Sequence, residues 1–397
     1  MKLLDQSNIN NSRKELYEHY HISCKTDISS DLYVDKKVIK TVSCLDDFNR
    51  PYVYTIKSDR NMLLQQCVKN YFDAKYDSIF NTNSYKKRPG RHVSQAIADI
   101  YRLINLSKMK YCLKIEIKDI NKSKAFIKRK LNARGVSDRF LFKAIDAMGE
   151  DYGDEYILRD TYINILLSDF DDWLDSQWRV NPAIYKTKSY VTSSGAVNYG
   201  NSYKKMRNTN LKEFYFVRYG NEICIFSKDF DVIKKVKCAC VNYLNKHYKN
   251  IDLKTNLIDL TAKSLYFDVF RIKIKNSKAC SFIQDDVCLG IYKKLKQSMK
   301  EISKAKSIKD MCKDVYAYND LVDFYKDYCN VAMNVSVDFH SIHDKMRISF
   351  YNMLTRNTHI KYGSIGSCLY LTESNIKVQD IGSVRYRKPK CLSKNVI

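Results

Sequence analysis

Proline and glycine are scarce in this chain of 397 residues, which contains only 4 Pro and 11 Gly. No Pro-rich or Gly/Ser-rich linker separates one part of the sequence from another, and no internal repeat is evident. Domain boundaries must therefore be inferred from changes in the hydrophobic pattern.

Paired cysteines are also missing, although the chain has 13 Cys. They are scattered singly, none forms a C-x-x-C pair, and the closest two, Cys238 and Cys240, are separated by one residue. This spacing excludes a zinc-finger type of metal framework. Cysteines in apolar contexts, such as Cys112 and Cys224, are typical of a reducing compartment, where Cys packs as a small hydrophobic side chain.

Long apolar runs are absent as well. No window approaches the roughly 18 uncharged apolar residues that a membrane span needs. The first residues lead into polar sequence, and the early Asp5 and Glu15 argue against an organellar transit peptide. We therefore expect a soluble intracellular protein without a membrane partner. It would reside in a plastid or mitochondrion if encoded there, and otherwise in the cytoplasm.

Positive charge, in contrast, is abundant. Lys and Arg number 69 against 44 Asp and Glu, a net charge of +25, and hydrophobic residues make up 45% of the chain. Such a chain can bury a large core and form two or three domains. The charge favours a polyanionic partner, with nucleic acid first among the candidates. Part of the excess has an alternative origin in the Lys-, Asn- and Tyr-rich composition typical of an AT-rich genome.

The hydrophobic pattern predicts an α+β fold. Beta-branched and aromatic residues favour a strand at 52–56, and strict alternation favours another at 111–117. Helical spacing predicts a polar helix within about 1–30, amphipathic helices at 61–80 and from Val93 to Ile104, and further helices up to about residue 180. Residues 214–274 have the pattern strand, hairpin tip, strand, helix, strand, and from Val287 the chain is mainly helical and basic.

The tetrapeptide Tyr219-Gly220-Asn221-Glu222 interrupts two strand-like runs, so it is expected to form a hairpin tip that presents polar side chains. A further acidic residue, Glu116, lies near the end of the strand at 111–117. Two-metal nucleotidyl transfer requires carboxylates from separate strands that converge on a pair of divalent cations. Acidic residues at strand ends are also common without any catalytic role, so this pattern by itself leaves both interpretations open.

Several sequence blocks occur in the order found in one enzyme family. The blocks are Ser58-Asp59-Arg60, the segment 79–91 with its Arg88-Pro89-Gly90-Arg91 end, Leu113-Lys114-Ile115-Glu116-Ile117-Lys118, Asn164-Ile165-Leu166-Leu167, the tetrapeptide, and 264–271. Together they resemble the reverse transcriptases encoded by group II introns.

This resemblance implies a right-hand polymerase fold. We expect a fingers-like region at 1–110, a palm at 111–276, and a basic helical region at 277–397 that corresponds to the thumb and maturase segment. The paired cysteines and histidines of the family's optional C-terminal nuclease have no counterpart in the sequence.

The same resemblance places Glu116, Asn221 and Glu222 at the catalytic, metal-binding positions, where the family has three aspartates. The substitutions remove one negative charge and lengthen the two remaining carboxylates by a methylene each. Mg²⁺ demands near-ideal octahedral geometry, and catalytic groups displaced by about 1 Å can lose roughly a hundredfold in rate. The implied cofactor is Mg²⁺ or Mn²⁺ if the protein is active, and none otherwise.

Other family features depart at the same time. Residues 153–155 stand in place of a Pro-Gln-Gly loop, Ile120 and Asn121 replace aromatic residues, and Val269 replaces the glycine of the primer-gripping hairpin. Because the metal site, loop, aromatics and primer grip all differ, loss of polymerase activity is the favoured interpretation.

Basic and aromatic residues are the candidates for contact with nucleic acid. Guanidinium groups make bidentate phosphate contacts, although some of these arginines have the alternative role of fixing loops. Phe350 and Tyr351, beside Arg347, suit stacking on RNA, with an ordinary solvated helix face as the alternative. The candidate residues are Arg50, Arg60, Arg88, Arg91, Tyr219, Lys293 and Lys294.

Three functional hypotheses follow from the sequence. The first is a degenerate reverse transcriptase that binds structured RNA and keeps a maturase-like role in splicing. The second is an active RNA-directed DNA polymerase with a variant Glu/Asn/Glu metal site, most plausibly Mn²⁺-dependent. The third is a phage-defence relative on the same fold.

Overall fold

The computed structural model describes residues 2–20, 22–25, 28, 40–46, 48, 51–56, 58–120, 123–148, 157–179, 184–205, 214–248, 251–354, 360–362, 369–371 and 377–389. Its helices are α1 Gln6–Tyr20, α2 Asp59–Tyr76, α3 Val93–Asn105, α4 Lys124–Ala133, α5 Arg139–Ala147, α6 Arg159–Arg179, α7 Phe230–His247, α8 Asp285–Lys304, α9 Ile308–Cys329 and α10 Val335–Leu354. The 3-10 turns are η1 Asp77–Ile79 and η2 Ile381–Ser383.

The strands form small antiparallel sheets, so the fold is α+β. They are β1 Lys40–Leu45, β2 Pro51–Ile56, β3 Tyr111–Asp119, β4 Ile184–Val191, β5 Val197–Lys205, β6 Phe214–Tyr219, β7 Glu222–Ser227, β8 Asp252–Asp259, β9 Leu265–Phe267, β10 Phe270–Lys275, β11 Lys278–Ile283, β12 Ile360–Tyr362, β13 Leu369–Leu371 and β14 Lys377–Val378.

The central sheet has the strand order β6-β7-β3-β8, with every neighbouring pair antiparallel. Side chains alternate between its two faces. Leu113 and Ile115 of β3 belong to a core that includes residues of α1, α2 and α4 to α7. Cys112 of β3 and Phe226 of β7 point the other way, into a core shared with α3, β9 to β11 and the helices α8 to α10. The sheet therefore separates two hydrophobic cores.

Helix α2 begins at Ser58, whose side chain accepts a hydrogen bond from the Asn61 N–H. Helix α3 begins with a capping box between His92 and Gln95. Such caps satisfy N–H groups that the first turn of a helix leaves without partners. In the part of the chain that the structure describes, no helix combines the length and apolar character needed to cross a bilayer.

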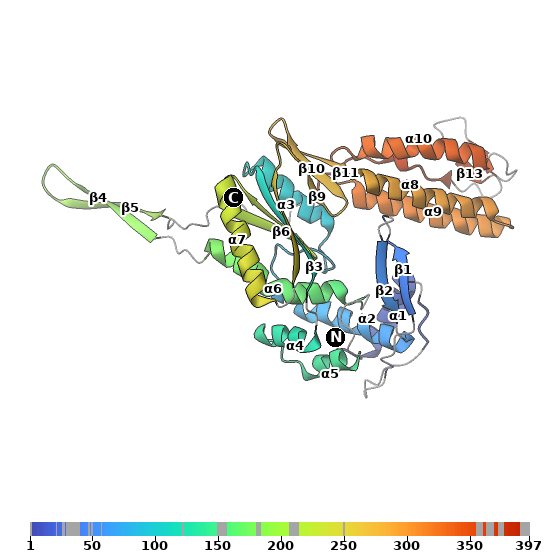
Figure 1. Cartoon of the computed structure of the whole chain (residues 1–397), viewed down its shortest axis with the longest axis horizontal. Coiled ribbons are helices and arrows are strands. Elements are labelled where there is room, and N and C mark those ends of the chain that lie inside the picture. Colours follow the sequence, from blue (N-terminus) through green and yellow to red (C-terminus); the bar gives the residue numbers. More distant parts are fainter. Residues whose placement is uncertain are drawn as a thin grey trace.

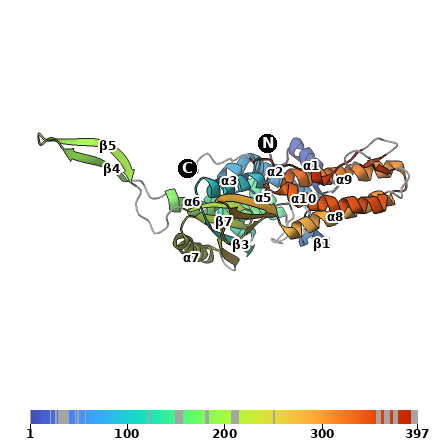
Figure 2. The same cartoon turned by 90° about the horizontal axis from the view of Figure 1, so that it is seen from above.

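Figure 1 shows three groups of elements around the central sheet: the helices α2, α4 and α5 below it, the bundle of α8, α9 and α10 to one side, and a ribbon formed by β4 and β5 on the opposite side. The ribbon projects away from the body of the protein in both views (Figures 1 and 2). Strands β1 and β2 lie between α2 and the bundle.

Most predicted elements are present. The strands at β2 and β3, the helices α1, α2, α3 and α7, and the β6–β7 hairpin all match the expected segments. Two features differ. The β4–β5 ribbon was not predicted, and short strands β12 to β14 follow the expected C-terminal helices. The boundary placed after residue 276 falls inside the hairpin of β10 and β11, so those paired strands belong to one unit.

Candidate functional site

The β6–β7 hairpin ends in a two-residue turn. Tyr219 pairs with Glu222, and Gly220 and Asn221 form the connection. Gly220 has φ of 65°, and a Cβ added there would lie 2.7 Å from Cδ of Lys86. A positive φ at the first central position is typical of a type II′ turn, whose twist suits a hairpin. The tetrapeptide predicted as a hairpin tip is confirmed.

The hairpin places two candidate carboxylates together. Glu116 of β3 is directly opposite Glu222 of β7 in the antiparallel register. Both lie on the sheet face that also carries Cys112, Cys224 and Phe226, at its polar end. The expected convergence of carboxylates from separate strands is therefore seen for this pair.

Glu222 is fully engaged by other parts of the protein. Its Oε1 lies 3.1 Å from Nζ of Lys114, and its Oε2 accepts a hydrogen bond of 3.2 Å from the Asp268 N–H. Lys114 also donates to the Tyr266 carbonyl at 2.7 Å. These contacts tie the β6–β7 hairpin to the turn between β9 and β10.

The Asn221 side chain bonds to the backbone of β3. Its side-chain nitrogen donates to the Ile117 carbonyl at 2.9 Å, and its own carbonyl accepts from the Ile117 N–H at 3.0 Å. The amide therefore closes the end of β3 against the hairpin. The Glu116 side chain differs, because it makes no hydrogen bond or ion pair with any described residue.

These three residues, as folded, do not fit a pair of divalent metal ions. Both oxygens of Glu222 have partners, Asn221 bonds to the backbone, and an ammonium group already lies beside the carboxylates. Nowhere in the described ranges do three or more His, Cys, Asp or Glu side chains gather as a metal-binding group.

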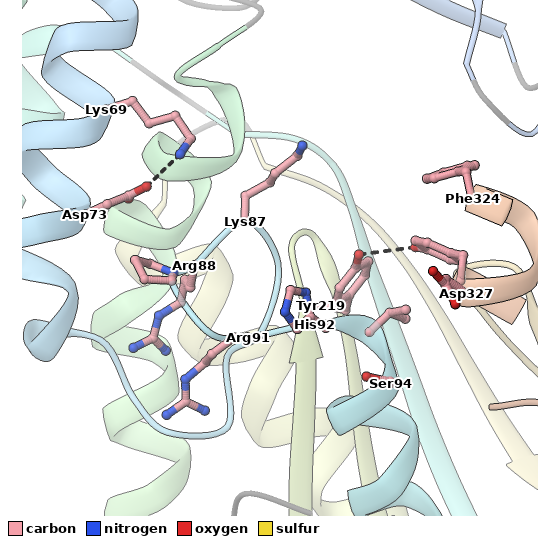
Figure 3. A pocket seen from close by; sticks show the side chains of 13 residues that line it. Lys69, Asp73, Lys87, Arg88, Arg91, His92, Ser94, Tyr219, Phe324 and Asp327 are labelled. Atoms are coloured by element: carbon pink, nitrogen blue, oxygen red, sulfur yellow. Dashed lines mark hydrogen bonds and ion pairs between the residues drawn. The ribbon is translucent and has the colours of Figure 1, made fainter. Parts of the chain in front are cut away.

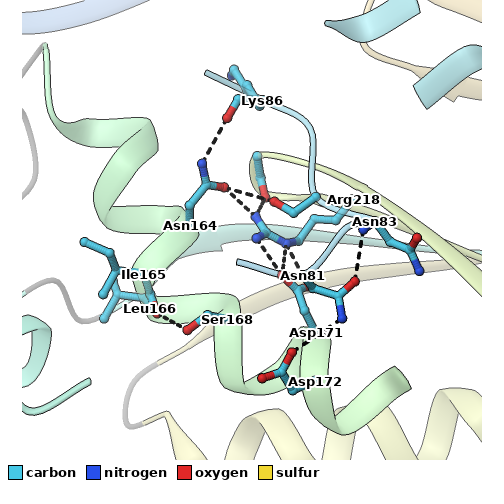
Figure 4. Close-up of polar contacts among 12 residues, drawn as sticks. Asn81, Asn83, Lys86, Asn164, Ile165, Leu166, Ser168, Asp171, Asp172 and Arg218 are labelled. Carbon is cyan, nitrogen blue, oxygen red and sulfur yellow. Dashed lines mark hydrogen bonds and ion pairs between the residues drawn. The ribbon is translucent and has the colours of Figure 1, made fainter. Parts of the chain in front are cut away.

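A buried ion pair between β6 and helix α6 holds the hairpin in place (Figure 4). Arg218 and Asp171 are both fully buried, and the Arg218 Nη2 donates to Asp171 Oδ2 at 2.7 Å. Arg218 Nη1 donates to Asn164 Oδ1 at 2.9 Å and to the Gly220 carbonyl at 2.8 Å. The turn of the tetrapeptide is thereby held by helix α6.

Arg218 and Asn164 also hold the segment 81–91 in place. Backbone hydrogen bonds link Arg218 to Asn83 and Tyr85, and Asn164 donates to the Lys86 carbonyl at 2.9 Å. Blocks that are far apart in the sequence thus meet at the hairpin. Their side-chain partnerships explain why segment 81–91 lies beside Tyr219.

A pocket of about 620 Å³ opens where the hairpin tip meets the segment 81–91 (Figure 3). It is formed by α2, the loop into α3, the hairpin tip and α9. Its lining is rich in cationic and aromatic side chains, with two acidic ones, Asp73 and Asp327. The other lining residues are Lys69, Lys87, Arg88, Pro89, Arg91, His92, Val93, Ser94, Tyr219, Phe324 and Tyr328.

Aromatic contacts close one side of the pocket. The hydroxyl groups of Tyr219 and Tyr328 are 3.3 Å apart, and Tyr328 donates to Asp268 Oδ2 at 2.6 Å. Burial raises the pKa of Tyr328 well above its ordinary value, so the hydroxyl stays protonated. Phe48, only 5% exposed, packs on Phe324 and Tyr328 with ring centroids 5.9 and 4.9 Å away. The N-terminal region therefore touches α9 directly.

Of the four arginines predicted to bind nucleic acid, Arg91 is best placed. It lines the pocket, donates to the Thr82 carbonyl at 2.5 Å and lies 5.6 Å from the Tyr85 ring centroid. Burial, and then the nearby charge of Arg88, lower the pKa of the Arg91 guanidinium. No carboxylate pairs with Arg91 in the described ranges, so its charge is available to an anion.

Arg88 has a different role from the one expected. It is 7% exposed, and its donors go to Asp77, Asn81 and Ser84. Five N–H groups meet five acceptor contacts, which leaves none for a phosphate. Arg88 therefore fixes the loop, the alternative considered for these arginines. Arg60 lies half-buried in the first turn of α2, outside the pocket lining, and Arg50 lies outside the described residues.

The candidate residues of the C-terminal helices lie outside the pocket lining. Lys293 is exposed and Lys294 is half-buried on α8. Phe350 is 5% exposed and packs edge-on against Tyr318, so it does not present a ring for stacking on RNA. The side chain of Tyr351 lies outside the described part of the chain.

Two of the positions that differ from the expected family pattern, Val269 and Ile120, lie in the described structure. Val269 is fully buried in the turn between β9 and β10, and Ile120 is 5% exposed. Asn121 and residues 153–155 lie outside the described residues.

The sequence reasoning missed Lys114, Lys87, His92, Tyr328 and Asp171. Lys114 could have been identified from the sequence, because it precedes Glu116 by two residues and so shares its face of the strand. Lys87 and His92 flank the arginines of segment 79–91. The partners of Tyr328 and Asp171 depend on tertiary contacts that sequence spacing does not reveal.

No family model matches the sequence, and no curated protein matches it. Among solved structures, telomerase from Candida albicans, determined in complex with a TWJ fragment of telomeric RNA, is similar with a TM-score of 0.32 and 12% sequence identity. The match covers 86% of this chain and 65% of the telomerase chain. At this TM-score the likeness carries no argument about function.

Proposed function

We propose that this protein is a reverse-transcriptase-like protein that binds structured RNA, has lost most or all polymerase activity, and acts like a maturase in intron splicing. The observation that carries the proposal is the state of the predicted metal site. Glu222 is paired with Lys114 and the Asp268 N–H, and Asn221 bonds to the Ile117 carbonyl. Such a site has no free ligand set for the two-metal chemistry of a polymerase.

The pocket beside the hairpin supports RNA as the partner. Arg91 and Lys87 bring positive charge to a cavity that also contains Tyr219 and Phe324. Cationic groups that follow a backbone and aromatic rings that stack on bases are the usual means of binding single-stranded nucleic acid. The net charge of +25 adds long-range attraction to a polyanion.

An RNA-binding titration tests the first half of the proposal. Binding of a structured, intron-like RNA should weaken steeply with salt, since an interface with about six phosphate contacts loses on the order of a thousandfold between 50 and 200 mM salt. Arg91→Gln should weaken binding several-fold. Arg139→Gln, an exposed arginine outside the pocket lining, is the matched control and should bind like the unmodified protein.

Primer extension on an RNA template, with Mg²⁺ and separately with Mn²⁺, tests the second half. We expect no extension above background with either ion. Robust extension that disappears in Glu116→Ala would favour the active polymerase instead, and the unpaired state of Glu116 makes that residue the one to test. Stimulation of intron splicing at low Mg²⁺ would support the maturase role, whereas RNA binding without it would favour the phage-defence alternative.

A further inference from the structure

The sheet face at the hairpin carries two like charges in direct opposition. Glu116 and Glu222 are cross-strand partners, and side chains in such positions have Cβ atoms about 4.5–5.5 Å apart. Directly opposed like charges destabilise an antiparallel sheet. A folded protein with this pair therefore needs a nearby cation.

Lys114 supplies that cation from within the chain. It lies on the same face of β3, two residues before Glu116, with its Nζ 3.1 Å from Glu222 Oε1. The Lys114 side chain is 13% exposed, so its charge is only weakly screened by water. Its hydrogen bond to the Tyr266 carbonyl fixes the ammonium group in position.

A second lysine stands opposite the other carboxylate in the strand register. Lys254 of β8 is the cross-strand neighbour of Glu116 on the side away from Glu222. The charges of these four side chains, Lys114 and Lys254 against Glu116 and Glu222, sum to zero. Asp268 approaches Glu222 with its backbone N–H, while its carboxylate accepts from Tyr328. These four side chains therefore leave no excess negative charge to attract a divalent cation.

We infer that Lys114 is the resident cation of this carboxylate site, that it takes the position a divalent metal ion would need, and that its removal uncovers a latent metal site. The inference deepens the proposed function and rests on it for the polymerase-like assignment of the hairpin. Its consequence is specific: the protein is insensitive to Mg²⁺ and Mn²⁺ at this site because a lysine occupies it.

Mn²⁺ binding, followed by loss of the electron paramagnetic resonance signal of the free ion, tests the inference. The unmodified protein should bind no Mn²⁺ at the hairpin. Lys114→Gln, which removes the charge but keeps a donor for the Tyr266 carbonyl, should gain binding, and Lys114→Gln with Lys254→Gln should approach one ion per chain. Adding Glu222→Gln to that double variant should abolish the gain.

Lys235→Gln is the matched control, because Lys235 is an exposed lysine on α7, which packs against the other face of the sheet. It should bind no more Mn²⁺ than the unmodified protein. Thermal unfolding gives a second readout: Mn²⁺ should raise the midpoint of the Lys114 variants by several degrees and leave the unmodified protein unchanged. Far-ultraviolet circular dichroism verifies that each variant is folded.

Two results would overturn the inference. One is an Mn²⁺ ion bound by the unmodified protein and lost in Glu116→Gln. The other is folded Lys114 variants that bind no more Mn²⁺ than Lys235→Gln. Because neither readout uses primer extension, extension by the unmodified protein without Mn²⁺ binding at this site would contradict the proposed function and leave the inference standing.

Discussion

Asp138 connects two helices through one carboxylate. It caps α5 by accepting hydrogen bonds of 3.0 Å from the Phe140 and Leu141 N–H groups. It also accepts from the Tyr71 hydroxyl at 2.6 Å and lies 3.3 Å from Lys75 Nζ, both on α2. Burial by itself would raise the pKa of Asp138, but the hydrogen bonds from Tyr71, Leu141 and Lys75 outweigh it and lower the pKa from 3.8 to about 2.

This lowered pKa predicts a pH dependence of stability. A carboxylate with a depressed pKa in the folded state stabilises the protein above its unfolded value, near 4, and that contribution is lost as the pH falls towards 2. Allowing for screening, Asp138 should contribute about 1–2 kcal/mol at neutral pH. Urea unfolding between pH 5 and 3 should show a shallower loss of stability in Asp138→Asn.

Asp286→Asn changes an exposed carboxylate on α8 and serves as the control for that measurement. It should follow the pH profile of the unmodified protein. An Asp138→Asn profile parallel to the unmodified one would show that Asp138 does not titrate as its contacts require.

At the scale of single residues, sequence reasoning found the positions of the site and missed their partners. The alternation of β3 and the hairpin signal together indicated that Glu116 and Glu222 converge from separate strands, and the structure places them directly opposite each other. Neither signal indicates that Lys114 reaches Glu222, because periodicity fixes the face of a strand and not the direction of a long side chain. The pairing of Arg218 with Asp171 joins residues 47 positions apart, and no local rule connects them.

Phe48 joins the N-terminal region to helix α9 of the C-terminal bundle. Its ring packs against three aromatic side chains of α9, Phe324, Tyr325 and Tyr328, with centroid distances of 5.9, 5.8 and 4.9 Å. Aromatic pairs at such distances stabilise a contact by about 0.5–1.5 kcal/mol beyond the area that they bury. This cluster borders the pocket and fixes how near α9 lies to it.

Phe48→Ala should therefore weaken both the fold and the position of α9. Truncation of a buried Phe costs about 3–5 kcal/mol, so denaturant unfolding should register a loss near the lower end of that range. Amide hydrogen exchange should speed up in the turns of α9 that carry Phe324 and Tyr328. Phe140→Ala, at a side chain 37% exposed, is the control and should cost far less. Unchanged exchange in α9 would contradict the linking role of Phe48.

The elements themselves were predictable where one strong period dominates. Helix α3 has apolar residues on one face only, and β3 alternates strictly, so both were identified near their true bounds. The β4–β5 ribbon was missed because its sequence is rich in Lys, Tyr, Ser and Asn and lacks the apolar alternation of a core strand. Polar ribbons of this kind carry little hydrophobic signal.

The charge of the whole molecule sets two opposite responses to salt. A net charge of +25 makes the free protein repel itself, and added salt screens that repulsion. A bound polyanion also relieves it, but salt weakens that binding through the loss of counterion release. Salt should therefore stabilise the free protein and reduce the additional stability conferred by RNA.

Thermal unfolding over a salt series, with and without a structured RNA, tests this expectation. At 50 mM salt, RNA present at about 100 times its dissociation constant should add about 2.7 kcal/mol. By 500 mM salt the two curves should converge, because the free protein has gained stability while the complex has lost its advantage. Arg91→Gln should behave like the unmodified protein when free and gain less from RNA, since its effect is confined to the pocket. A stabilisation by RNA that does not change with salt would show that the cationic surface is not what holds the RNA.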